Sequence, residues 1–158
     1  MLRKIIVSIC ILFVLTGCSK YYVNEEFDDK LILNIDSINL SEEVSINSID
    51  EYVNGIVLFS EYGRPDIIGS NTIIGAHSGY GSNAYFNYLS HLNLGDMIYL
   101  KYDGYEYKYE VKRVYEVFDT DLYVLDSDEF TKLTLLTCKI GENNKRIVTI
   151  ISRYYLLL

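Results

Sequence analysis

Alternation of apolar and polar residues is clearest in the second half of the chain. Residues 97–102 predict a strand, Asp103 and Gly104 a tight hairpin turn, and residues 105–117 a long returning strand. Along the returning strand, apolar or aromatic positions alternate with charged ones: Tyr105, Tyr107, Tyr109 and Val111 against Glu106, Lys108, Glu110 and Lys112. This period of two predicts one buried face and one solvent-exposed face.

Shorter apolar runs predict the other strands, over residues 31–35, 56–59, 71–76, 133–137 and 146–158. Short helical segments are expected over residues 48–53, 84–89 and 126–132, and loops over residues 63–69, 78–82 and 139–145. About eight short strands with little helix are typical of an all-β protein built as a closed or nearly closed β-barrel.

The first 17 residues have the pattern of an export leader. Arg3 and Lys4 precede an almost wholly apolar run over residues 5–15, and small residues follow. The run is about 11 residues long, shorter than the roughly 20 that a membrane-spanning helix needs. The sequence Leu-Thr-Gly-Cys that ends at Cys18 resembles a bacterial lipobox, in which the cysteine is diacylated and becomes the new N-terminus. We therefore expect lipid attachment at Cys18.

The alternative is an uncleaved signal anchor, with Cys18 as a bystander. Either arrangement holds the rest of the chain at the outer face of a membrane. The predicted organisation is a leader over residues 1–17, a polar and acidic tether over residues 18–29, and one domain over residues 30–158.

Charge argues against some classes of partner. The formal net charge is −8, and loss of Arg3 and Lys4 with the leader makes the exported part more acidic. Phosphate binding needs a basic face, so neither a nucleic-acid partner nor a polybasic contact with anionic lipid is expected. The 16 tyrosines fit β-structure, because aromatic side chains pack well on a pleated surface.

Cys138 is the residue that points most directly to chemistry. Of the three cysteines, Cys10 lies in the leader and Cys18 ends it, so Cys138 is the one thiol expected in the exported domain. A lone thiol outside the cytoplasm is open to oxidation and cannot form a disulfide within its own chain. The alternative role for Cys138 is that of a small buried hydrophobe.

Thiol chemistry requires a proton donor for the leaving group, and the chain has two histidines. His77 follows the predicted buried strand 71–76 and precedes a Gly-rich segment, which is where scaffolds commonly place reactive groups. His91 is expected at the end of a helix, as an exposed or capping residue. His77 is therefore the candidate partner of Cys138.

Arg146 begins the strand that is predicted after the Cys138 loop. If the strands on either side of that loop are neighbours, Arg146 returns beside Cys138. A guanidinium there can hold a substrate carbonyl and stabilise a developing oxyanion. Arg153 competes for this role but lies seven residues further along, and a surface arginine remains the simpler alternative for either.

Together these motifs resemble the sortase family of cell-surface cysteine transpeptidases. Residues 134–138, Thr-Leu-Leu-Thr-Cys, are similar to the family's nucleophile motif, and Arg146 before Ile-Val is similar to its arginine. Residues 71–77 resemble the strand that carries the family's histidine, and residues 86–96 its helix and turn. Ala76, where many members have glycine, and the lipobox, where many have a transmembrane anchor, are departures.

The resemblance implies an eight-stranded β-barrel with His77, Cys138 and Arg146 as catalytic residues. Cys138 would attack a Thr–Gly-type bond in an LPxTG-like sorting signal, and an amine would resolve the thioester. The implied partners are surface proteins that carry the signal and an amine of a peptidoglycan precursor, pilin or other surface protein. No cofactor is implied. Some family members bind calcium, but the sequence offers no ligand cluster that we would assign.

Two other functions remain open at this point. An L,D-transpeptidase also places its histidine before its cysteine, but its Ser-His-Gly-Cys signature is absent, since Leu-Thr precedes Cys138. A lipid-anchored binding or adhesion module would need no reactive thiol.

Overall fold

The computed structural model describes residues 30–46, 54–127 and 130–153. The predicted leader, Cys18, the tether, the helix over residues 48–53 and the last five residues of the predicted closing strand lie outside this range.

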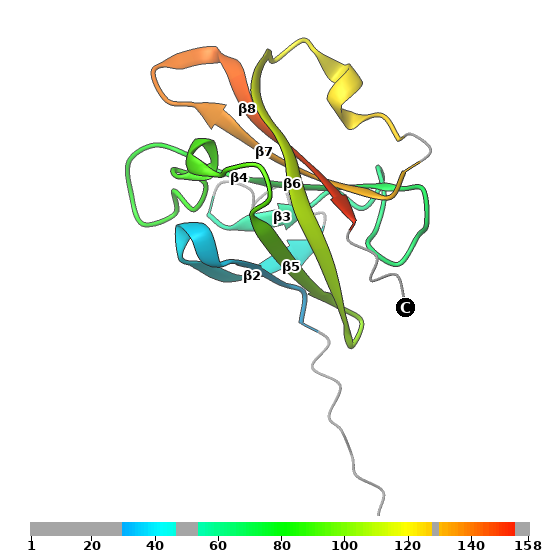
Figure 1. The fold of residues 1–158 in the computed structure, drawn as a ribbon. Helices are drawn as coiled ribbons and strands as arrows, with labels where there is room; N and C mark the ends of the chain where they lie inside the picture. The colour runs from blue at the N-terminus through cyan, green and yellow to red at the C-terminus, as the bar shows by residue number, and fades with distance from the viewer. Residues whose placement is uncertain (1–29, 47–53, 128–129, 154–158) are drawn as a thin grey trace, which may run out of the picture.

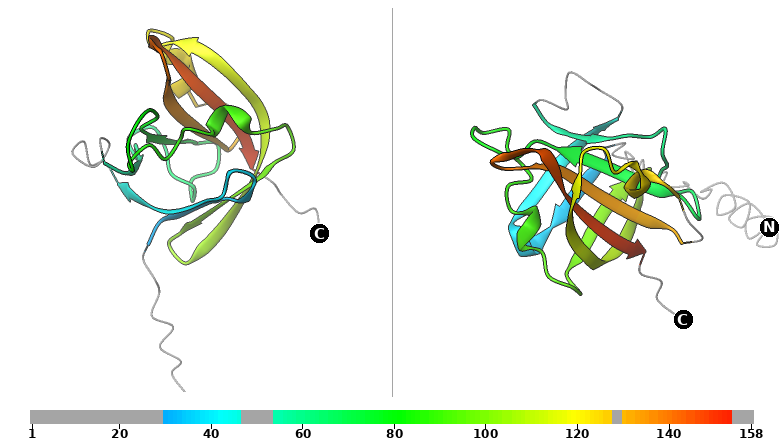
Figure 2. Two further views of the ribbon diagram at one scale, coloured as in Figure 1. Left: turned by 90° about the vertical axis from the view of Figure 1, so that its left-hand side faces the viewer. Right: turned by 90° about the horizontal axis from the view of Figure 1, so that it is seen from above.

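The described chain forms one closed β-barrel with the strand order β1-β2-β3-β4-β7-β8-β6-β5. The antiparallel pairing of β1 with β5 closes it. Figures 1 and 2 show the strands wrapped around a common interior, with the β5–β6 and β7–β8 hairpins at opposite ends. The predicted eight-stranded barrel with minor helix is therefore confirmed. The strands are β1 (Ile32–Ile35), β2 (Leu40–Ile46), β3 (Ile56–Leu58), β4 (Asn71–Ala76), β5 (Met97–Tyr102), β6 (Tyr105–Phe118), β7 (Lys132–Lys139) and β8 (Glu142–Arg153), with 3-10 helices η1 (Asp36–Ile38), η2 (Leu89–His91) and η3 (Leu122–Leu125).

The barrel interior is filled by side chains from one face of each strand. In β6, Tyr109 and Val111 are fully buried and Tyr107 nearly so, as the alternation predicted, whereas Tyr105 beside the hairpin turn is 67% exposed. Burying each large apolar side chain contributes roughly 1.5–3 kcal/mol. The central members of this core include Leu33, Ile35, Ile74, Phe86, Leu89, Ile98, Leu100, Leu133, Leu135 and Ile151.

A second, smaller apolar cluster lies on the outer face of the barrel. Val124 and Leu125 of η3 pack there against Leu136 of β7, Val148 of β8 and Val117 of β6. β7 consequently has apolar contacts on both faces. All six residues of its parallel neighbour β4 are buried as well. Burial on two faces explains why these strands are continuous runs of apolar and small residues without alternation.

Strand β2 was missed by the sequence analysis. It pairs antiparallel with β1 and parallel with β3. Only Leu40 and Val44 are buried, and three exposed polar residues separate them. That spacing has neither the period of a half-buried strand nor a continuous apolar run, so pairing with its two neighbours determines the conformation.

Of the three predicted helices, the two that fall within the described residues were wrong in position. Residues 85–88 form turns, and the helical turn is η2; Phe86 and Leu89 are both buried. The Phe86 amide donates to the His77 carbonyl instead of to a preceding turn of helix. The helical turn that was expected over residues 126–132 lies earlier, in η3, and Lys132 already belongs to β7.

The polar loop predicted over residues 139–145 was also wrong. Only Ile140 and Gly141 separate β7 from β8, and Gly141 has the positive φ of 83° that this tight turn requires. The polar residues that follow form the projecting start of β8, where charged side chains pair across the hairpin. Arg146 thus lies within β8 and does not open it.

Candidate active site

The register of two strand pairs determines which groups surround Cys138. In the parallel β4–β7 pair, Gly75 lies opposite Leu136. Extending this register by two residues brings His77, just beyond the end of β4, level with Cys138. In the antiparallel β7–β8 pair, Cys138 lies directly opposite Arg146. The fold therefore places His77, Cys138 and Arg146 on three adjacent segments at one end of the sheet.

Two side-chain hydrogen bonds fix the β4–β7 register next to the thiol. Thr137 Oγ1 donates to the Ala76 carbonyl at 2.8 Å. Ser78 Oγ donates to the Cys138 carbonyl at 2.5 Å. Thr137 and Ser78 are both buried. These bonds flank the position of His77, so any slip of β4 along β7 would break both of them.

The segment that carries His77 is held by Asn87. The Gly79 amide donates to Asn87 Oδ1 at 2.7 Å, and Asn87 Nδ2 donates to the Gly79 carbonyl at 3.1 Å. Gly79 has a φ of 142°, and a Cβ atom there would lie 3.2 Å from His77 Nε2. Glycine therefore allows the backbone to approach the imidazole closely, and the half-buried ring has little room to move on that side.

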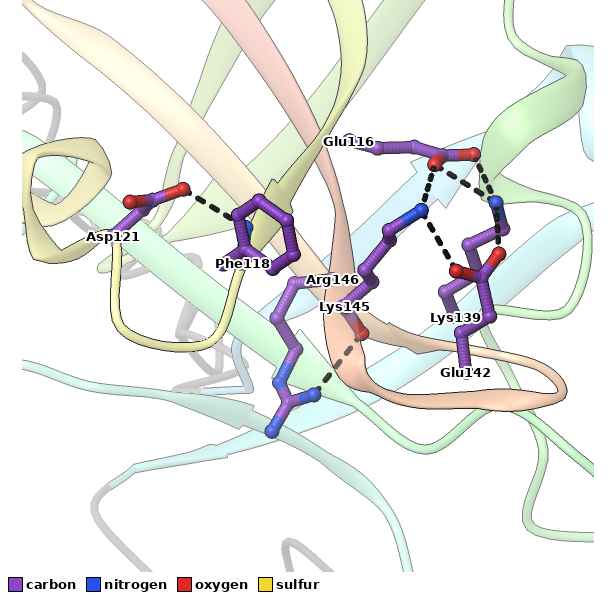
Figure 3. Close-up of polar contacts among 7 residues, drawn as sticks. All are labelled: Glu116, Phe118, Asp121, Lys139, Glu142, Lys145 and Arg146. Atoms are coloured by element: carbon purple, nitrogen blue, oxygen red, sulfur yellow. Dashed lines mark hydrogen bonds and ion pairs between the residues drawn. The ribbon is translucent and has the colours of Figure 1, made fainter.

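Arg146 is oriented by backbone carbonyls. Its Nη1 donates to the carbonyls of Asn143 at 2.9 Å and Lys145 at 3.0 Å. Its Nη2 lies 3.9 Å from Asp119 Oδ2, and the side chain is 26% exposed. Figure 3 shows the guanidinium directed away from the charged residues of the β7–β8 hairpin.

The hairpin charges Lys139, Glu142 and Lys145 join Glu116 of β6 in a closed cluster that the sequence analysis did not foresee (Figure 3). Lys139 Nζ lies 2.7 Å from Glu116 Oε1 and 2.6 Å from Glu142 Oε1, and Lys145 Nζ lies 2.7 Å from Glu142 Oε2. Hydrogen bonds to Glu116 and Glu142 raise the pKa of Lys139. Hydrogen bonds from Lys139 and Lys145 lower the pKa of Glu142 to about 2. The four charges balance one another, whereas Arg146 stands outside this cluster.

Two hollows adjoin the Cys138–Arg146 pair. Cys138 borders a hollow of about 220 Å³, which is lined by Ser78, Phe86, Asn87, Ser90, Glu116, Thr137, Lys139, Ile140 and Ile147. Arg146 borders a smaller one of about 70 Å³, lined by Val117, Phe118, Asp119, Asp121, Leu122, Val124, Leu125 and Leu136. The first lies beside the His77 segment and the second beneath η3, so the pair can be approached from two sides.

The competing candidates are a histidine of η2 and an arginine further along β8. His91 is exposed at the end of η2, with its ring 5.4 Å from that of Tyr88. Arg153 lies opposite Tyr109 of β6, seven residues along β8 from Arg146. The strand registers thus bring His77 and Arg146 level with Cys138 and place Arg153 further along the sheet.

The sequence analysis did not assign a role to Asn71 or to Thr134. Asn71 is fully buried at the start of β4, and its Oδ1 accepts a hydrogen bond from Thr134 Oγ1 at 2.7 Å. Both threonines of the Thr-Leu-Leu-Thr-Cys motif therefore bond to β4. Asn71 and Thr134 are polar residues within two runs that were predicted to be buried strands. That was the signal available in the sequence, because buried polar groups need hydrogen-bond partners.

Within residues 30–46, 54–127 and 130–153, no three histidine, cysteine, aspartate or glutamate side chains are grouped closely enough to hold a metal ion. Across the same ranges, no helix combines the length and apolar character needed to cross a bilayer.

A thiol, an imidazole and a guanidinium at one edge of a sheet can together perform covalent acyl transfer. The thiol supplies the nucleophile, the imidazole moves protons, and the guanidinium meets negative charge on a carbonyl oxygen. Cys138 is partly accessible and, in the described part of the chain, is not in a disulfide, as a nucleophile must be.

The Sortase domain model matches residues 33–153. No match was found among curated proteins. Among solved structures, the lid mutant of sortase A from Corynebacterium diphtheriae has a TM-score of 0.75 and 23% identity, over 81% of this chain and 71% of that one.

Sortase C-1 from Actinomyces oris gives a TM-score of 0.75 at 22% identity, over 83% of this chain and 77% of that one. Sortase C from Clostridium perfringens SM101 gives 0.70 at 25% identity, over 82% and 72%. These similarities support the shared barrel, and the domain match spans nearly the whole described chain. The chain therefore belongs to the sortase family.

Proposed function

We propose that this protein is a cysteine transpeptidase that cleaves an LPxTG-like sorting signal and joins the cleaved surface protein to an amine. The observation that carries this proposal is the pair of strand registers that brings His77, Cys138 and Arg146 together. Membership of the sortase family supports the same chemistry.

In the first step, His77 takes the proton of the Cys138 thiol and the sulfur adds to the carbonyl carbon of the Thr–Gly-type bond. Collapse of the tetrahedral intermediate breaks the C–N bond and leaves a thioester, while His77 gives a proton to the departing amine. In the second step, the incoming amine attacks the thioester and His77 accepts its proton. The new amide forms and the thiol is released, so no cofactor is consumed.

Arg146 is proposed to stabilise the oxyanion of both intermediates. A guanidinium has five N–H donors in a planar fork, and the two backbone carbonyls engage only Nη1. Arg146 lines the smaller hollow, where its Nη2 also lies 3.9 Å from Asp119 Oδ2. The positive charge of the guanidinium at this position stabilises an oxyanion more than the neutral carbonyl of the substrate.

The two hollows suggest separate places for the two substrates. The smaller one, with its apolar wall of η3 and Leu136, suits the apolar part of a sorting signal whose carbonyl meets Arg146. The larger one borders Cys138 and the Ser78 segment next to His77, which suits the departing and incoming amines. The acyl part of the sorting signal and the two amines then lie on opposite sides of the thiol.

The partners follow from this chemistry. The acyl donor is a surface protein that carries the signal, and the acceptor is an amine of a peptidoglycan precursor, a pilin or another surface protein. Attachment to the outer face of the membrane, through lipid on Cys18 or a signal anchor, places the enzyme where both substrates occur.

Peptide transfer by site variants tests the proposal. The full chain is incubated with LPxTG-like peptides and an amine acceptor, and transfer products are quantified by mass spectrometry. We expect Cys138→Ala to abolish transfer and His77→Ala to lower its rate by roughly 10²–10⁴-fold, since proton transfer is lost. His91→Ala is the matched control and should remain near wild type. Turnover by the Cys138→Ala variant would refute the proposal.

A further inference from the structure

Asn71 carries a buried hydrogen-bond network that the proposed reaction does not use. Its side chain is fully buried at the start of β4. Its Oδ1 accepts from Thr134 Oγ1 at 2.7 Å, and its Nδ2 donates to the carbonyls of Val124 at 3.1 Å and Asp126 at 3.2 Å. Its backbone amide also donates to Ser127 Oγ at 3.3 Å. One residue thus contacts both β7 and the segment that ends η3.

The two ends of this network lead to different parts of the site. Asn71 is on the strand that precedes His77, and Thr134 is on the strand that carries Cys138. Val124 and Leu125, at the other end, line the smaller hollow together with Arg146. The Asn71 amide group therefore links the strands that bear the reactive groups to the outer wall of the hollow.

The η3 segment depends on this anchor. It is a 3-10 helix of four residues, and such short helices have little stability of their own. Leu122 is 66% exposed and Tyr123 59% exposed, so the first half of η3 packs little against the barrel. The carbonyls that Asn71 binds lie on either side of Leu125 and fix the backbone at that point.

Only an amide side chain satisfies all three partners. Asparagine accepts from a hydroxyl with its oxygen and donates to two carbonyls with its NH₂ group. Aspartate can accept from Thr134, but it places a carboxylate against two carbonyl oxygens. Alanine leaves the buried Thr134 hydroxyl and both loop carbonyls without this partner, and unpaired buried groups are costly.

We propose that Asn71 is a positioning residue for the peptide-binding hollow, because it holds η3 at a fixed place relative to Arg146. It then sets the affinity for the sorting peptide and leaves the chemistry of the Cys138 thiol unchanged. This inference rests on the proposed function, since it assigns the hollow beneath η3 to the acyl donor.

The test compares Asn71→Ala and Asn71→Asp with the wild-type full chain in three measurements. Hydrogen exchange of the peptide covering residues 118–127 reports on η3, and alkylation of Cys138 by iodoacetamide reports on the thiol. Peptide-transfer kinetics report KM and kcat. We expect exchange over residues 122–127 to rise about tenfold and KM to rise by a similar factor, as loss of buried hydrogen bonds predicts. Alkylation and kcat should change by less than about twofold, since neither depends on the peptide-binding wall.

Three further variants isolate the contact. Asn34→Ala removes another strand asparagine whose side chain accepts a hydrogen bond, from Ser41, on the far strand β1, and should change none of the readings. Thr134→Ser keeps the hydroxyl and should behave like wild type. If Asn71→Ala fails to fold, Ser127→Ala removes the exposed hydroxyl that accepts a hydrogen bond from the backbone N–H of Asn71. This variant should raise hydrogen exchange of the same segment by a smaller factor.

The outcomes separate this inference from the proposed function. Unchanged exchange at η3, or increased exchange with unchanged KM, would overturn the role of Asn71. A loss of alkylation as large as the loss of transfer would also overturn it, because the residue would then act on Cys138. A wild-type chain that transfers no peptide, together with looser η3 in Asn71→Ala, would refute the proposed function and leave the anchoring of η3 in place.

Discussion

Strand β7 carries Cys138 between two neighbours that are joined to it by very different means. On the β4 side, Thr134, Thr137 and Ser78 make buried side-chain hydrogen bonds across the seam. On the β8 side, the hairpin tip is joined by the solvent-accessible ion pair of Lys139 with Glu142, and Glu116 of β6 and Lys145 of β8 extend this charge cluster. The first seam determines the position of His77, and the second carries Arg146.

The two seams differ in how strongly and how precisely they hold their neighbours. A buried hydrogen bond is directional, and leaving its partner unpaired costs about 1–3 kcal/mol. Exposed ion pairs contribute much less and weaken in salt. The proposed proton transfer between His77 and a substrate on Cys138 would require a fixed distance, and the buried seam restricts that distance. Apart from its backbone hydrogen bonds, the hairpin is held by ion pairs whose strength depends on pH and salt.

Among the changes that probe this comparison, the largest effect is expected at Arg146, where the proposed catalysis can be impaired without disturbing either seam. Arg146→Ala should lose about 2.7–4 kcal/mol of transition-state stabilisation, a 10²–10³-fold decrease in rate, if the guanidinium acts as an oxyanion donor. Arg146→Lys should retain partial activity, because lysine has the charge but not the fork. Transfer rates, with circular dichroism to confirm folding, measure both.

Arg153→Ala is the control for Arg146. Its position, seven residues further along β8 and opposite Tyr109, predicts near-neutral behaviour. A larger loss from Arg153→Ala than from Arg146→Ala would show that the wrong arginine has been assigned.

An intermediate effect is expected from the buried seam. Thr137→Val removes the bond to the Ala76 carbonyl and should lower the free energy of unfolding by about 0.5–1.5 kcal/mol in urea titrations. Thr149→Val, in the next strand, is the matched control. The Thr149 hydroxyl is buried without a hydrogen-bond partner among the described residues, so its loss should be neutral or stabilising. Equal destabilisation by the two variants would contradict the role of the seam.

The smallest effect concerns the exposed hairpin cluster. The pKa of Glu142 is lowered from 4.5 to about 2, so its ion pairs add stability above pH 4.5 that is lost as the pH falls toward 2. An NMR titration of the Glu142 carboxyl carbon should have a midpoint near pH 2, and 1 M salt should move it upward because exposed charges are screened. A midpoint that remains near 4.5 at low salt would show that the pairs do not form in solution.

The sequence predicted those parts of the fold and site that depend on local pattern. The alternation in β6, the buried run of β4 and the Thr-Leu-Leu-Thr-Cys motif located the barrel and the candidate residues. Arg146 was expected beside Cys138 on the condition that their strands are neighbours, and the β7–β8 register meets that condition. The chemical roles of these residues remain a proposal.

Features that depend on contacts between distant segments were not predicted. Strand β2 lacks a periodic pattern and owes its conformation to β1 and β3. The position of η3 depends on Asn71, which is more than fifty residues away in the sequence. The polar residues after Gly141 indicated a loop, but they form the start of β8. The pairing of Lys139 with Glu142 across the hairpin exists only in the folded chain, so the sequence pattern could not reveal it.

The central claim is that Cys138 forms a thioester with the sorting peptide, and intact-mass analysis of the full chain tests it most directly. With an LPxTG-like peptide and no amine acceptor, the protein should gain the mass of the acyl fragment on Cys138. Hydroxylamine should remove this adduct, since a thioester is cleaved by a strong amine nucleophile, and Cys138→Ala should form none. An adduct that maps to another residue, or peptide cleavage that proceeds at the wild-type rate in Cys138→Ala, would contradict the account.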